Sequence, residues 1–156
     1  AHGPAVPPEP GTWTVAALAA AVREQGGGDV SAVLADLLAE GALVAIEPDT
    51  EAAIDAARGY RFRSLLAGLG PGAVDSEQFV IGLVGQPVAL VDELSYEFWQ
   101  WAPLHPSVWD ACRAMAAVDQ QVTGGSRDPE QMLTELLPRI QALLGAGAGY
   151  LDEAAS

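Results

Sequence analysis

The clearest structural signal in the sequence is a β-hairpin over residues 79–91. Two short runs rich in β-branched and aromatic residues, 79–81 and 88–91, flank a turn at Gly85 and Gln86, and this arrangement is typical of two antiparallel strands. Proline has no N–H to donate to a strand ladder, so the strand that contains Pro87 is expected at the edge of its sheet. The chain must therefore combine a small sheet with helices, because most of the remaining sequence has a helical period.

Two amphipathic helices and a strand are predicted before the hairpin. Thr14 is a good N-cap for the first helix, which ends at three successive glycines. Asp29 caps the second helix, and Gly41 is placed to end it. The run 42–46 then suits a short strand. A helix, a turn, a second helix and a strand that leaves at once are typical of the latter part of a winged helix.

The rest of the chain is predicted to contain four more helices and one more strand. Pro138 is expected to kink or break the last helix. The spacing in the helix before Pro103 places Phe98 and Trp101 on one inward face. The expected elements are a short helix within 48–59 capped by Asp49 or Thr50, a strand near 60–66, and three helices that begin near Leu94, Ser107 and Asp128.

The two halves of the sequence resemble each other. Thr14 corresponds to Ser107 and Asp29 to Asp128, and one insertion in the loop between them reconciles the two alignments. We interpret this as an internal repeat. The sequence therefore predicts a helix-rich α+β fold of two winged-helix-like units with short antiparallel β-hairpins. The predicted domains are a proline-rich tail over 1–11, a first unit over 12–59 and a second unit over 60–156 that opens with strands.

The second half is similar to the PqqD-like peptide-recognition domains. The stretch 87–95, running on into Phe98 and Trp99, resembles the join between the last strand and the first helix of that family. The stretch 107–111 resembles the start of the family's second helix. The resemblance implies a winged helix that binds a leader peptide in the biosynthesis of a modified peptide.

The resemblance also implies where a peptide would bind. The peptide would add as a strand between the third strand and the last helix, where main-chain hydrogen bonds supply affinity and apolar side chains supply selectivity. Arg139 is then expected to pair with an acidic residue of the peptide. The alternative for the apolar members of this set is that they form core. The matching positions are Val88, Leu90, Met132, Leu136 and Arg139.

Two aromatic residues complete the set of candidate partner-binding residues. Tyr96 and Trp99 share a helical face that differs from the face of Phe98. They either anchor a partner from an exposed position or are buried between the two units, and we expect burial because two small units need a shared core.

The charge of the chain argues against a nucleic acid partner. Twenty-one acidic residues face seven arginines, lysine is absent, and the net charge is −14. Such a charge repels phosphates and anionic membranes. The two helices that would read DNA, 29–40 and 128–139, carry three acidic residues each, and Arg139 is their only base. We therefore expect another protein or a peptide as the partner.

Signals for a membrane, a signal peptide, a metal or a cofactor are not evident. No apolar run reaches the roughly 18 residues needed to span a bilayer, and the single cysteine agrees with a reducing compartment, so a cytoplasmic location is predicted. Cys112 lies on the apolar stripe of its helix and is expected in the core, which argues against a nucleophile paired with His105. No cofactor is predicted.

The sequence thus favours a non-catalytic adaptor or peptide-recognition subunit, with its oligomeric state open. Two alternatives remain. One is a winged-helix transcriptional regulator whose basic surface forms on dimerisation from Arg58, Arg61 and Arg63. The other is a small enzyme, because general acids need no recognisable motif. A deep polar cleft that holds a carboxylate with a shifted pKa would favour the enzyme.

Overall fold

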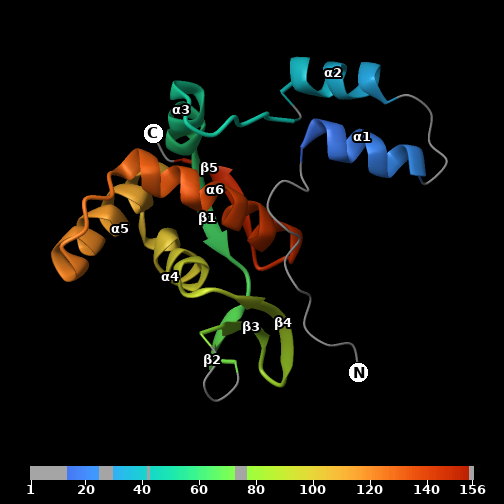
Figure 1. The fold of residues 1–156 in the computed structure, drawn as a ribbon. Helices are drawn as coiled ribbons and strands as arrows, with labels where there is room; N and C mark the ends of the chain where they lie inside the picture. Colours follow the sequence, from blue (N-terminus) through green and yellow to red (C-terminus); the bar gives the residue numbers. More distant parts are fainter. Residues whose placement is uncertain (1–13, 25–29, 42, 73–76, 155–156) are drawn as a thin grey trace.

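The structure is a computed structural model that describes residues 14–24, 30–41, 43–72 and 77–154 (Figure 1). Within these residues the chain combines helices with two small antiparallel sheets, so the predicted α+β class with short antiparallel hairpins is confirmed. The two winged-helix-like units stay a prediction. The helices are α1 (Val15–Glu24), α2 (Ser31–Ala39), α3 (Glu51–Gly59), α4 (Glu93–Trp101), the 3-10 turn η1 (Ala102–Leu104), α5 (Val108–Thr123) and α6 (Pro129–Gly145). The strands are β1 (Tyr60–Ser64), β2 (Ala67–Pro71), β3 (Phe79–Leu83), β4 (Gln86–Val91) and β5 (Gly149–Glu153).

The predicted hairpin is confirmed as β3 and β4. The turn between them is one residue earlier than expected, at Val84 and Gly85, and Gly85 adopts a φ of 79° that favours glycine. β2 pairs with the other side of β3, so the sheet has the order β2-β3-β4 and Pro87 lies in an edge strand, as predicted. No sequence pattern predicted β2, because Gly68, Gly70 and Pro71 interrupt any apolar alternation.

The strand predicted near 60–66 forms as β1 but belongs to a different sheet. It pairs with β5 near the end of the chain, from Tyr60 opposite Glu153 to Ser64 opposite Gly149. Arg61 and Asp152 lie opposite each other in this pair and form an ion pair of 2.7 Å. The hydrogen bond from Arg61 holds the pKa of Asp152 below its ordinary value. β5 was not predicted, because its pairing partner is far away in the sequence.

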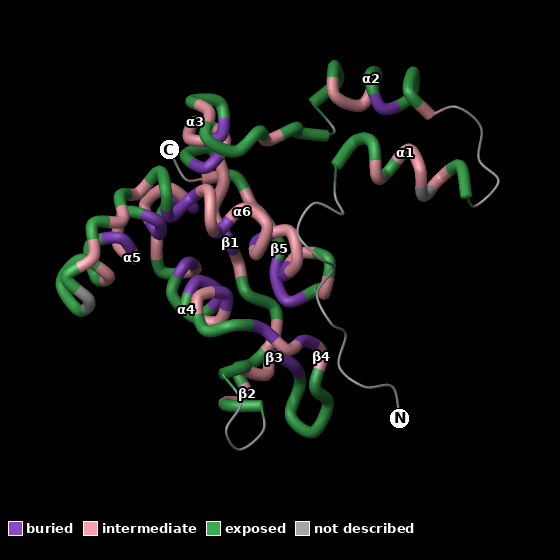
Figure 2. Tube along the Cα trace, in the orientation of Figure 1, coloured by how far each residue is buried: buried purple, intermediate pink, exposed green. Residues whose placement is uncertain are grey.

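One hydrophobic core joins α3, β1, the hairpin and α4 to α6 (Figure 2). Its largest fully buried side chains include Phe62, Phe98, Ile81 and Leu136. α3, which we placed in the first unit, packs against α5 and β1 in this core. None of the described residues of α1 and α2 belongs to it, and Figure 1 shows the two helices apart from the other elements. The domain boundaries stay a prediction.

The strand predicted at 42–46 and the break predicted at Pro138 are not observed in the described residues. Residues 43–46 form no strand, although Ile46 packs against the core. α6 runs through Pro138 without a break. Leu136 and Ile140 are buried on either side of this proline, and their burial offsets the one backbone hydrogen bond that proline cannot make.

Candidate functional site

The outer edge of β4 is open to an additional strand. In the described part of the chain β4 pairs with β3 alone, so its other edge has no strand beside it. An edge strand presents unpaired N–H and C=O groups that an extended segment is able to join. Gly82 holds β4 close to β3, because a Cβ at this position would lie 2.9 Å from the Val88 nitrogen. The shape of this edge therefore depends on a glycine in the neighbouring strand.

Val88 and Leu90 line this edge on the side of the sheet that faces away from the core. Their neighbours Ala89 and Val91 are buried in the core cluster, whereas Val88 and Leu90 are half-buried. Successive side chains of a strand point to opposite faces, so the two half-buried residues share the outer face. Side chains of an added strand would lie next to them at cross-strand distance. Both predicted residues are thus accessible at a free sheet edge.

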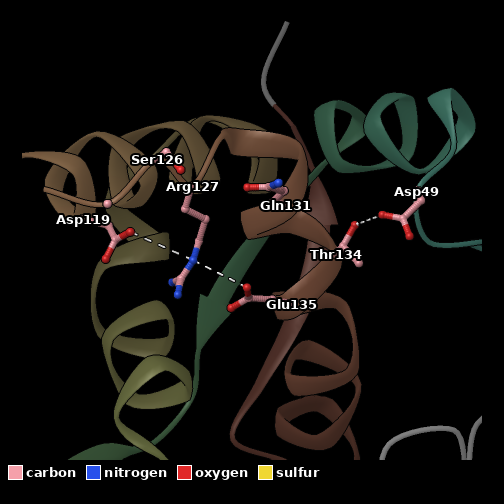
Figure 3. Close-up of a pocket in the computed structure, with 8 residues that line it drawn as sticks. Asp49, Asp119, Ser126, Arg127, Gln131, Thr134 and Glu135 are labelled. Atoms are coloured by element: carbon pink, nitrogen blue, oxygen red, sulfur yellow. Dashed lines mark hydrogen bonds and ion pairs between the residues drawn. The ribbon is translucent and has the colours of Figure 1, made fainter. Parts of the chain in front are cut away.

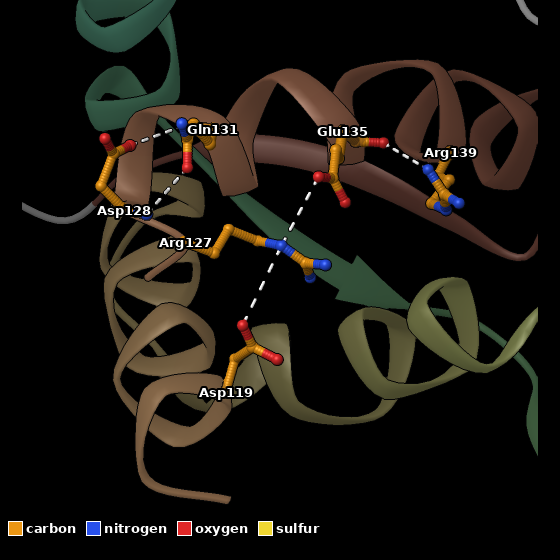
Figure 4. A network of polar contacts seen from close by, with 6 residues as sticks. All are labelled: Asp119, Arg127, Asp128, Gln131, Glu135 and Arg139. Atoms are coloured by element: carbon orange, nitrogen blue, oxygen red, sulfur yellow. Dashed lines mark hydrogen bonds and ion pairs between the residues drawn. The ribbon is translucent and has the colours of Figure 1, made fainter. Parts of the chain in front are cut away.

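Arg139 joins α6 to the end of β4 through Asp92. Its Nε and Nη2 donate to the Asp92 carboxylate at 3.0 and 2.9 Å. Its Nη1 donates to the Glu135 carbonyl at 2.7 Å, as Figure 4 shows. Asp92 also caps α4 by accepting from the Ser95 N–H. Partial burial opposes ionisation of Asp92, but the bonds from Ser95 and Arg139 outweigh it and hold the pKa of this carboxyl below its ordinary value. Arg139 is therefore already paired within the chain.

Met132 and Leu136 lie in the core instead of on the surface of α6. Met132 is 1% exposed and Leu136 is 0% exposed. Neither side chain is accessible to a peptide in this structure, so their part is to hold α6 in place beside the sheet. Both residues are therefore core residues in this structure, which is the alternative that the sequence left open.

The two candidate aromatic residues serve the packing of α4. Trp99 is buried and donates from its indole Nε1 to the Ala148 carbonyl at 2.8 Å. Tyr96 is half-buried and stacks on Phe79 with ring centroids 4.6 Å apart. Trp99 is thus buried, and its hydrogen-bond partner lies in the segment before β5. Burial had been expected between the two predicted units.

The face that α4 turns to the core differs from the one predicted. Its buried residues are Ser95, Phe98 and Trp99, followed by Ala102 at the start of η1, which follow the helical spacing i, i+3, i+4 and i+7. Trp101 was expected to face inward and is 50% exposed instead. The buried face therefore combines Phe98 from one predicted aromatic stripe with Trp99 from the other.

A shallow groove that the sequence did not indicate lies beside the first half of α6 (Figure 3). The Thr134 hydroxyl donates to Asp49 at 2.6 Å, and Asp49 has a left-handed backbone with a φ of 61°. Arg127 lies 4.0 Å from Asp119 and 3.5 Å from Glu135. These residues come from distant parts of the sequence, so no local sequence pattern predicts that they lie together. Arg127 is the one cation of this lining and faces three carboxylates, so the groove is negatively charged.

Among the described residues, the arginines do not gather into a positively charged surface along either helix that was considered for DNA binding. Arg58 pairs with Asp55 and lies over the Trp109 ring at 5.5 Å, and Arg61 pairs with Asp152. Two of the three arginines that were expected to form a basic surface on dimerisation are therefore already paired with carboxylates of the same chain. Within the part of the chain that the structure describes, ion pairs with carboxylates are formed by Arg58, Arg61, Arg113, Arg127 and Arg139.

Cys112 is a core residue, as predicted. Its side chain is fully buried, and burial raises the pKa of its thiol to about 12. A thiol with such a pKa stays protonated at neutral pH and is a poor nucleophile. Among the described residues, no group of three His, Cys, Asp or Glu side chains is arranged to hold a metal ion. None of the described helices is both long enough and apolar enough to cross a membrane.

Comparisons with models of protein families, with curated proteins and with solved structures found no significant match to this chain.

Proposed function

We propose that this protein is a non-catalytic recognition subunit that binds an extended segment of another polypeptide along β4. The observation that carries the proposal is the free edge of β4, beside which Val88 and Leu90 remain half-buried on the outer face. Main-chain hydrogen bonds to such an edge supply affinity for any extended segment, and the adjacent side chains select among segments.

The order of the elements supports the same proposal. The resemblance to PqqD-like domains rests on an order of strands near 60–66, 79–83 and 88–91 followed by three helices. β3 and β4 precede α4 to α6 in that order, whereas β1 lies in the sheet with β5. By that resemblance, the bound segment belongs to a peptide that is modified in a biosynthetic pathway. Met132 and Leu136 then act by positioning α6, and Val88 and Leu90 are the residues that touch the peptide.

Binding can be tested with an uncharged probe. The probe is a fluorescently labelled, end-capped peptide of eight alternating valine and threonine residues, and its binding is followed by fluorescence anisotropy. We expect saturable binding, together with slower hydrogen exchange of backbone amides in 86–91 when the peptide is added. A strand that adds to an edge protects amides of that edge from solvent.

A pair of variants separates the edge from the rest of the surface. Val88→Ser combined with Leu90→Ser removes apolar contacts of up to about 1 kcal/mol each, and should weaken binding roughly 10-fold or more. Leu104→Ser is the control, because Leu104 is exposed on η1 and should leave binding unchanged. The proposal fails if the probe does not bind at millimolar concentration, or if the control variant weakens binding as much as the double variant.

A further inference from the structure

The hairpin sheet is uncharged over most of its length and acidic at one end. No residue from Gly82 to Val91 carries a charge. Phe79 pairs with Val91, so the residues that precede β3 and those that follow β4 lie at the same end of the sheet. Glu77, Asp92 and Glu93 are all exposed there. A segment that adds to β4 would therefore meet apolar surface along the strand and carboxylates at its end.

Arg139 offsets the charge of Asp92, but no ion pair among the described residues involves Glu77 or Glu93. Each of the three guanidinium nitrogens of Arg139 already donates within the chain, to Asp92 or to the Glu135 carbonyl. The positive charge of Arg139 is thus already paired with Asp92, which lowers what an acidic peptide would gain from it. Glu97 lies one turn after Glu93 on α4, and partial burial, followed by the charges of Glu93 and Asp119, raises the pKa of Glu97. The negative potential thus continues from the sheet end along α4.

We infer that the segment bound along β4 carries lysine or arginine at the end that lies next to Asp92 and Glu93, while its remaining residues are apolar and uncharged. This inference rests on the proposed function. Like charges brought together on binding lower affinity and opposite charges raise it, and both effects fall as salt rises. A second copy of this chain is disfavoured as the occupant, because each copy has a net charge of −14 and includes no lysine.

The inference can be tested with charged versions of the same probe. Two lysines, two glutamines or two glutamates are added to either end of the eight-residue valine–threonine peptide, and dissociation constants are measured at low and high salt. We expect one of the two lysine peptides to bind about 2- to 20-fold more tightly than its glutamine equivalent, since one or two exposed charge pairs are formed. The glutamate peptides should bind more weakly than both. The preference should shrink when the salt concentration rises from about 0.05 to 0.5 M.

A matched pair of variants locates the effect. Glu93→Gln should reduce the advantage of the lysine peptide about 2- to 5-fold and leave the glutamine peptide unchanged. Glu40→Gln is the control, because Glu40 is exposed at the end of α2 and should change neither. If the lysine, glutamine and glutamate peptides bind equally, or if the glutamate peptide binds most tightly, the inference is wrong and the proposed function stands. If none of the peptides binds, the proposed function itself is wrong.

Discussion

The position of Trp99 yields a prediction that separates a core residue from a partner-binding residue. Trp99 is 6% exposed, and its indole N–H donates to the Ala148 carbonyl. Trp101 lies two residues further along α4 and is 50% exposed. Trp99→Phe and Trp101→Phe are therefore the same chemical change in one helix at two degrees of burial.

The expected loss of stability follows from what each substitution removes. Trp99→Phe deletes one hydrogen bond, worth about 1 kcal/mol net. The Ala148 carbonyl keeps a second donor, because the Leu65 N–H lies 3.1 Å from it, so it does not become unsatisfied. The smaller ring also removes buried apolar atoms, worth about 1–2 kcal/mol. We expect the free energy of unfolding to fall by about 2–3 kcal/mol for Trp99→Phe, and by less than about 0.5 kcal/mol for Trp101→Phe.

Urea unfolding followed by far-ultraviolet circular dichroism measures both variants without relying on tryptophan fluorescence. With a denaturant dependence of about 2 kcal/mol per molar urea, the midpoint of Trp99→Phe should shift by roughly 1 M. The midpoint of Trp101→Phe should stay within about 0.3 M of the wild type. Equal midpoints for the two variants would refute the assignment of Trp99 to the core, and with it the packing of α4 on the segment before β5.

Two further predictions concern the ends and the backbone of the hairpin. Because the pKa of Asp92 is lowered in the folded state, its charge stabilises the fold above the ordinary carboxyl pKa and ceases to do so as the pH falls below it. Asp92→Asn should therefore lower the unfolding midpoint at pH 7, with a difference that shrinks below about pH 4. Glu97→Gln, which removes a carboxyl whose pKa is raised, should not lower it at pH 7. Gly82→Ala should destabilise the protein by about 1–3 kcal/mol, because its Cβ would press on the backbone of β4. Gly59→Ala has no atom within 4 Å of the added Cβ and should change stability little, as thermal unfolding would show; equal effects at both glycines would contradict the close approach of β3 and β4.

Residues next to one another in the sequence allowed the helices and the hairpin to be predicted. Caps set the starts of α3, α5 and α6, where Thr50, Ser107 and Asp128 accept from backbone N–H groups as their residue types suggested. Pro87 correctly predicted an edge strand, because proline lacks the N–H that a central strand donates, and this property depends on the residue alone. The burial of Cys112 followed from the apolar stripe on its own helix.

Other features depend on contacts between residues that are far apart in the sequence. β5 has no strong pattern of its own and forms because β1 lies beside it, with Arg61 opposite Asp152. The buried face of α4 takes Phe98 from one aromatic stripe and Trp99 from the other, with Trp99 bonded to the Ala148 carbonyl, and a helical period alone does not predict this combination. The ion pair of Arg139 has the same origin, because the fold brings Asp92 to it from another element.

The sequence by itself therefore determined the helices, the caps of α3, α5 and α6, the hairpin with β4 at its edge, and the acidity that disfavours nucleic acid. The tertiary structure decided which apolar residues are core and which remain at the surface, and which charges are already paired. The physical reason is range: caps and periods act over a few residues, whereas burial and ion pairing act between elements whose distances only the folded chain sets. Val88 and Leu90 are left at an open edge by that long-range arrangement.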